Sequence, residues 1–190
     1  MRKYLLIHAI VISFVFFLTP TILAASDVER KIEELKQAIR IDPDYVKAHS
    51  NLGYAYYELG KYKEAIDAYK QAIRIDPDDA KAHYNLGVTY RESGMHKEAI
   101  ESFKQAIRID PDDAKAHNNL GNVYDESGKY EKAIEAFKQA IRIDPDHINA
   151  YYNLGLVYNL SNDKNSALDQ CEILKSLDPE MANKLFNIIY

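Results

Sequence analysis

The stretch Lys104-Gln-Ala-Ile-Arg-Ile-Asp-Pro-Asp112 decides the fold of this 190-residue chain, because it recurs at regular intervals. The copies begin at Lys36, Lys70, Lys104 and Lys138, so their starts are 34 residues apart. A fixed period of this length indicates an array of one supersecondary unit. Such an array buries its core between neighbouring units and leaves a long surface that can hold another molecule.

Each period is predicted to form a helical hairpin. In residues 80–113 the apolar side chains fall at helical spacing in two blocks, which Gly94 separates and Pro111 ends. A glycine tolerates the positive φ that a helix C-terminus favours, and a proline cannot continue the helix before it. Gly87 lies on the apolar face of the first block, where it leaves room for Phe103 of the second. The two helices are therefore expected to pack closely.

The period also sets the expected domain boundaries. Residues 80–113 and 114–147 are identical at 24 of 34 positions, whereas residues 148–181 match less closely. Asp178-Pro179 has the N-cap and first-position proline of a closing helix. The expected segments are 1–25 (signal peptide or N-terminal membrane anchor), 26–45 (capping half-repeat), 46–79, 80–113, 114–147 and 148–181 (repeats 1 to 4), and 182–190 (C-terminal capping helix).

The repeats resemble those of the tetratricopeptide repeat (TPR) family, whose pattern places Leu, Gly, Tyr, Ala, an aromatic residue, Ala and Pro at set positions. The second repeat matches this pattern with Leu86, Gly87, Tyr90, Ala99, Phe103, Ala106 and Pro111. The fourth departs from it, with Cys171 and Leu174 at two of the places. The resemblance implies a right-handed all-α solenoid of stacked antiparallel hairpins (a TPR superhelix), with the first helices lining a concave face that binds proteins or peptides.

A row of polar residues on the first helices is the candidate binding site. One asparagine recurs in all four repeats, and its amide can pair with an extended peptide backbone as donor and as acceptor. The row resembles the asparagine ladder in the repeat domain of O-linked N-acetylglucosamine transferase. The alternative is that these residues are consensus positions copied by duplication of the repeat. The candidate peptide-binding residues are Lys47, Asn51, Tyr54, Lys81, Asn85, Lys115, Asn119, Asn122 and Asn153.

These features favour a non-catalytic interaction scaffold. No motif for a nucleophile or a phosphate-binding loop occurs, so we expect neither an enzyme nor a cofactor. Histidines in register are too far apart to share a zinc ion, and Cys171 replaces a core aromatic. The alternative function is self-assembly, in which the solenoid ends stack as a homo-oligomer through terminal residues such as Met181, Phe186 and Ile189.

The first 25 residues predict export. Arg2 and Lys3 precede an apolar run, Pro20 and small residues, which is typical of a signal peptide and long enough for an uncleaved membrane anchor. Either interpretation places the body outside the cytoplasm, in the periplasm or the extracellular space, with membrane contact only through residues 1–25 if they are uncleaved. The remainder has 22 basic and 29 acidic residues, a balance that argues against binding nucleic acid.

Overall fold

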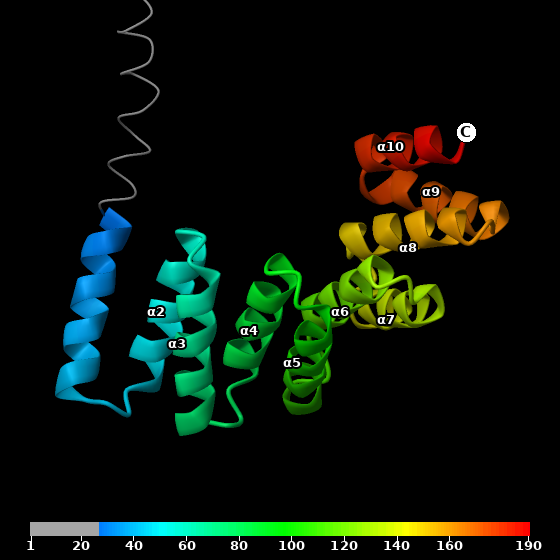
Figure 1. Cartoon of the computed structure of the whole chain (residues 1–190). Coiled ribbons are helices and arrows are strands. Elements are labelled where there is room, and N and C mark those ends of the chain that lie inside the picture. Colours follow the sequence, from blue (N-terminus) through cyan, green and yellow to red (C-terminus); the bar gives the residue numbers. More distant parts are fainter. Residues whose placement is uncertain (1–26) are drawn as a thin grey trace, which may run out of the picture. The chain divides into compact units, whose positions relative to one another are not determined.

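The computed structural model describes residues 27–190, which form helices and short connections without a strand. The expected signal or anchor segment, 1–25, lies outside the described residues. The described chain is an all-α solenoid of helical hairpins, as predicted (Figure 1). The described residues divide into two compact units, 27–75 (unit 1) and Asp76–Tyr190 (unit 2).

Unit 1 contains a helix at residues 27–41, followed by α2 (Val46–Glu58) and α3 (Tyr62–Ile75). Figure 1 shows the 27–41 helix beside the α2–α3 hairpin. Ile32 and Leu35 of this helix are buried in one cluster with Leu52 of α2. Ile41 at its end is 86% exposed. The 27–41 helix thus corresponds to the second half of a repeat.

Unit 2 contains three complete hairpins and a closing helix. Each helix packs against the next one in the chain, and α8, α9 and α10 form successive layers (Figure 1). The helices are α4 (Ala80–Glu92), α5 (His96–Ile109), α6 (Ala114–Glu126), α7 (Tyr130–Ile143), α8 (Ile148–Leu160), α9 (Lys164–Leu177) and α10 (Pro179–Ile189). The closing helix therefore begins at Pro179, three residues before the expected segment 182–190.

The turns within the hairpins have the predicted chemistry. Gly60, Gly94 and Gly128 have φ of 68°, 72° and 69°, and Asn162 takes the same role in the fourth hairpin with φ of 62°. Asparagine adopts this left-handed conformation more readily than most residues, because its short polar side chain can hydrogen-bond locally. At the start of α10, Asp178 caps the helix by accepting from the Met181 N–H at 3.0 Å.

A glycine packed against a ring sets the spacing of the helices in each of the first three hairpins. A Cβ built on Gly87 would lie 2.9 Å from the Phe103 ring, and one on Gly121 would lie 2.6 Å from Phe137. The predicted packing of Gly87 against Phe103 is therefore confirmed. In the fourth hairpin Cys171 cannot fill this space, and Leu185 of α10 packs against Gly155 instead.

The loops between repeats are tied to the helices that follow them by a repeated histidine. The Nε2 atom of His49 lies 2.9 Å from the Pro43 carbonyl oxygen, and His83 and His117 make the same bond to Pro77 and Pro111, at 3.0 and 3.1 Å. The fourth repeat has a buried tyrosine at this position. The histidines that align in the sequence thus hold the Asp-Pro turns in place.

Candidate functional site

The predicted binding residues divide between the two units. Lys47, Asn51 and Tyr54 lie on α2 in unit 1. The others lie in unit 2 on α4, α6 and α8. Of these three helices, α6 contacts both α4 and α8. The three helices therefore present their polar residues on one surface, which we call the amide face; its residues are Lys81, Asn85, Lys115, Asn119, Asn122 and Asn153.

Asn119 links the first helices of two successive hairpins. Its Nδ2 donates to the Tyr84 hydroxyl of α4 at 3.0 Å and to the Lys115 backbone carbonyl of α6 at 2.9 Å. The side chain is only partly exposed, so these bonds form in a region with reduced access to water. They hold the Asn119 amide in one orientation relative to both helices.

Asn153 forms the corresponding link between α8 and α6. Its Nδ2 donates to Asn122 Oδ1 at 2.9 Å and to Asn118 Oδ1 at 3.3 Å. Asn118 is a buried polar residue, and sequence reasoning did not select it. A signal was present, because Asn118 interrupts a position where the neighbouring repeats have Tyr84 and Tyr152. Exchange of an aromatic residue for an amide in one repeat marks a local polar contact.

These bonds determine what the amide face can offer a ligand. An asparagine amide has two N–H donors and one acceptor oxygen. Both N–H groups of Asn119 and of Asn153 are used within the protein, so each presents its Oδ1 as an acceptor. Asn85 makes no side-chain hydrogen bond to any residue in 27–190 and keeps both capacities. The face therefore offers acceptors on Asn119 and Asn153, and donors on Asn122 and the two lysines.

One edge of the amide face is closed by an ion pair. Nε and Nη2 of Arg91 donate to one oxygen of Glu126 at 2.7 and 2.5 Å, and the other oxygen lies 3.6 Å from His96 Nδ1. Burial, followed by the adjacent charge of Glu126, raises the pKa of Asp125. At the opposite edge Lys81 and Lys115 are exposed and form no ion pair with a described residue, so they remain available to carboxylates.

The candidate residues of unit 1 are more exposed. Tyr54 is 52% exposed, and a hydrogen bond with Glu58 raises the pKa of its phenol. Lys47 and Asn51 are also exposed. The phenol and the two polar groups could contact a ligand, but the described residues do not cross-link them as they do Asn119 and Asn153.

Candidate chemistry elsewhere is limited. Among residues 27–190, no group of three or more His, Cys, Asp or Glu side chains is placed to hold a metal ion. Cys171 is buried, and desolvation raises the pKa of its thiol, as expected for a core residue. In the same residue range no helix is long and apolar enough to cross a membrane.

The comparisons with known proteins agree with this architecture. The TPR repeat family matches residues 29–60, 53–94, 89–126 and 121–160, which together span more than half of the chain. The protein belongs to the tetratricopeptide repeat family, whose members serve generally as protein-interaction modules without catalytic activity. A search of curated proteins gave no significant match.

Several solved structures share the fold. A crystal structure of MamA is 30% identical with a TM-score of 0.78, and the alignment covers 83% of this chain and 92% of that one. MamA from Desulfovibrio magneticus RS-1 is 23% identical with a TM-score of 0.76, covering 88% and 95%. YrrB, described as a TPR protein with an unusual peptide-binding site, is 22% identical with a TM-score of 0.74, covering 88% of each chain. At these last two identities the likeness shows the fold alone.

Proposed function

We propose that this protein is a non-catalytic scaffold that holds an extended segment of another protein on the amide face of unit 2. The observation that carries the proposal is the fixed orientation of Asn119 and Asn153, whose free Oδ1 atoms are set by bonds between helices. Acceptors fixed before binding lose little conformational entropy when a ligand donates to them. Lys81 and Lys115 add positive charge for acidic side chains of the same segment.

The hydrogen bonds of the Asn119 and Asn153 side chains also contribute to the packing of α4, α6 and α8. A test must therefore separate binding from folding. Asn119 and Asn153 are unsuitable as first targets, because their loss would disturb contacts between helices. Asn85 and the two exposed lysines have no such partners among the described residues. They can be changed with little effect on the fold.

The test is capture of partners from envelope extract on the tagged full-length protein, with bound proteins identified by mass spectrometry. One variant carries Asn85→Ala, Lys81→Glu and Lys115→Glu. A matched control carries Lys97→Glu and Lys129→Glu, which reverse two exposed charges of unit 2 outside the amide face. We expect the native protein and the control to retain a partner that the first variant loses. Equal retention by all three proteins would show that Asn85, Lys81 and Lys115 are consensus residues without a binding role.

We also propose that residues 1–25 direct the protein out of the cytoplasm, since the sequence combines a basic start, an apolar run and small residues. Fractionation of the native host and sequencing of the mature N-terminus test this. A chain that begins near Ser26 in the periplasm or medium would support cleavage, and an intact membrane-bound chain would support the anchor. Recovery of the intact chain from the cytoplasm would contradict export.

Self-assembly through the solenoid end is the second candidate function. Phe186 and Ile188 of α10 are 46% and 50% exposed, and Tyr190 follows them. Ile189, which we expected to be part of this surface, is buried and cannot contribute to it. Light scattering as a function of concentration tests the idea with a Phe186→Ser/Ile188→Ser variant. A native protein that stays monomeric at high concentration would exclude assembly through this end.

A further inference from the structure

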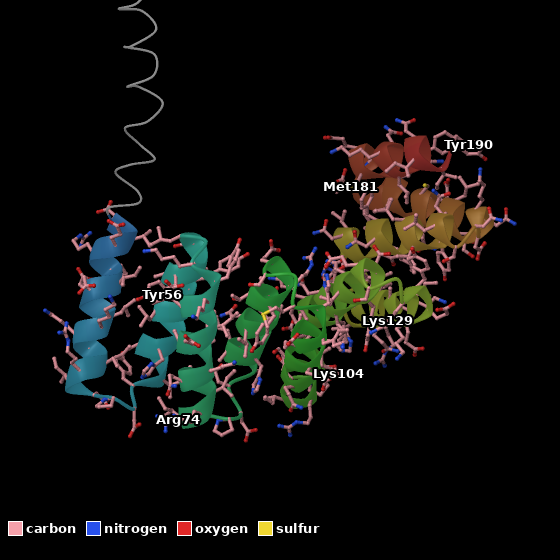
Figure 2. All side chains as sticks on the ribbon, in the orientation of Figure 1. Tyr56, Arg74, Lys104, Lys129, Met181 and Tyr190 are labelled. Carbon is pink, nitrogen blue, oxygen red and sulfur yellow. The ribbon has the colours of Figure 1, made fainter. Side chains whose placement is uncertain are left out.

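An open groove of about 700 Å³ lies in unit 1 between the 27–41 helix, α2 and α3. Its volume falls within the range of about 300–1,000 Å³ that is usual for ligand pockets. The groove is lined by apolar atoms of Leu52 and Ala68, and the ring of Tyr56 lies at one end; Figure 2 labels Tyr56 between the helices. Its α2 residues lie on the opposite side of that helix from Lys47, Asn51 and Tyr54. The groove is therefore a surface distinct from the candidate peptide-binding row.

Two of the three equivalent tyrosines in unit 2 show how a lysine of the chain itself covers this position. Tyr124 of α6 and Tyr158 of α8 have the same place in the repeat as Tyr56. The Nζ atom of Lys132 lies 5.9 Å from the Tyr124 ring centroid, and that of Lys138 lies 5.7 Å from the Tyr158 centroid. An ammonium within about 6 Å of a ring face is attracted by its quadrupole. A lysine of the chain thus completes the sites at Tyr124 and Tyr158.

Around Tyr56 none of the described residues places a cation over the ring face. Glu64 of α3 stands where α7 has Lys132. Lys36, the equivalent of Lys138, donates to Glu33 at 2.8 Å, and its contact with Tyr56 is made to the hydroxyl and not to the ring face. Neither the contact made by Lys132 nor the one made by Lys138 therefore has an equivalent over the Tyr56 ring.

The charges of the groove differ between its two ends. Glu64 and Asp67 are exposed near the Tyr56 end, and neither pairs with a cation among residues 27–190. Arg40 and His49 line the other end, because α2 runs antiparallel to its two neighbours. Lys36 also lines the groove near Tyr56, but it is paired with Glu33. The two unpaired carboxylates therefore attract a positive charge at this end, while Arg40 disfavours a second one further along.

We propose that this groove binds a segment of a partner protein that carries one lysine or arginine between apolar residues. The cationic side chain lies over the Tyr56 ring between Glu64 and Asp67, and the flanking apolar side chains cover Leu52 and Ala68. The binding reproduces, from outside, the contact that Lys132 and Lys138 make within the chain. This site is independent of the proposed function of the amide face.

The probe is the blocked tripeptide N-acetyl-Leu-Lys-Leu-amide, titrated into the full-length protein labelled with ¹⁵N and followed by NMR. We expect saturable shifts of backbone signals around Tyr56 and Glu64, with signals of α8 to α10 unchanged. The peptides with Gln or Glu in place of Lys should bind at least fivefold more weakly. Equal binding of the Gln peptide would overturn the proposal, because the site would then select for apolar groups only.

The decisive variant is Glu64→Lys. It places a lysine in α3 at the position of Lys132 in α7, and this lysine should cover the Tyr56 ring in place of the peptide. Its matched control is Glu98→Lys, the same change at the same place in α5, where it also removes an acidic residue from the first helical turn. We expect Glu64→Lys to lower the affinity for the lysine peptide at least fivefold and Glu98→Lys to leave it unchanged. Circular dichroism verifies that both variants fold. Native affinity in a folded Glu64→Lys variant, or an equal loss in both variants, would overturn the proposal.

Discussion

At the scale of single residues, the contact between Gly121 and Phe137 is the tightest of the glycine–ring contacts in the first three hairpins. The Phe137 ring is fully buried, so it has no free space into which it could move. An added methyl group would lie 2.6 Å from this ring, far inside van der Waals contact. The glycine is therefore required by packing, since its helix would otherwise favour alanine.

Gly121→Ala should destabilise the protein in spite of its better helix propensity. Overpacking a core costs about 1–3 kcal/mol, whereas exchange of glycine for alanine in a helix returns up to about 1 kcal/mol. We expect a net loss of about 1 kcal/mol in the free energy of unfolding, measured by urea denaturation. In a Phe137→Leu background the same change should be neutral or stabilising. Equal losses in both backgrounds would show that the ring is not the cause.

Asp125 provides a prediction of pH dependence. Burial, and then the charge of Glu126, raise its pKa in the folded protein above the ordinary value. The folded state therefore binds the proton more tightly than the unfolded state, and stability falls as pH rises from about 4 through the folded pKa. Asp125→Asn should raise the free energy of unfolding at pH 7 and change it little at pH 3. Denaturation of both proteins at the two pH values tests this, and a gain of the same size at both would contradict it.

At the scale of elements, α10 completes the fourth hairpin. Gly155 leaves the same space as the other repeat glycines, but α9 carries Cys171 where α7 carries Phe137. Leu185 enters this space and is fully buried. The closing helix thus replaces the missing aromatic side chain, in addition to shielding the end of the array.

Leu185→Ala should therefore cost about 2.7–5 kcal/mol of stability, as usual for a buried leucine that leaves a cavity. Phe186→Ala, on the 46%-exposed neighbour, should cost much less and serves as the control. Thermal and urea denaturation measure the loss of stability in both variants. A small effect of Leu185→Ala would mean that α10 is not part of the fourth hairpin's core.

The hairpins, their turns and the glycine–aromatic packing were predictable from the sequence, because each depends on residues within one period. Asn162 could be assigned to its turn for the same reason. The role of Leu185 could not be predicted from the sequence, since it depends on how α10 packs against α8 and α9. Likewise the sequence places Asn119 and Asn153 in a row, but only the structure shows which of their amide groups are already bonded. The groove beside Tyr56 depends on side-chain positions in three helices.

At the scale of the whole molecule, contacts in unit 2 remain local along the chain. Each helix packs against its immediate neighbours, and α4, α6 and α8 also contact the next of the three. Neither α4 nor α5 contacts α9 or α10 among the described helices. The stability of such an array is approximately a sum of repeat and interface contributions, in contrast to a protein with one shared core.

Local destabilisation should therefore stay local. Gly87→Ala forces a methyl group against Phe103, at 2.9 Å, and should speed amide hydrogen exchange in α4 and α5 more than in α9 and α10. Leu185→Ala should produce the reverse pattern, with faster exchange in α8, α9 and α10. Exchange measured by mass spectrometry on both variants resolves these segments. If either substitution accelerated exchange equally throughout unit 2, the unit would unfold as one cooperative block, and a ligand bound to the amide face would then stabilise every helix of the unit alike.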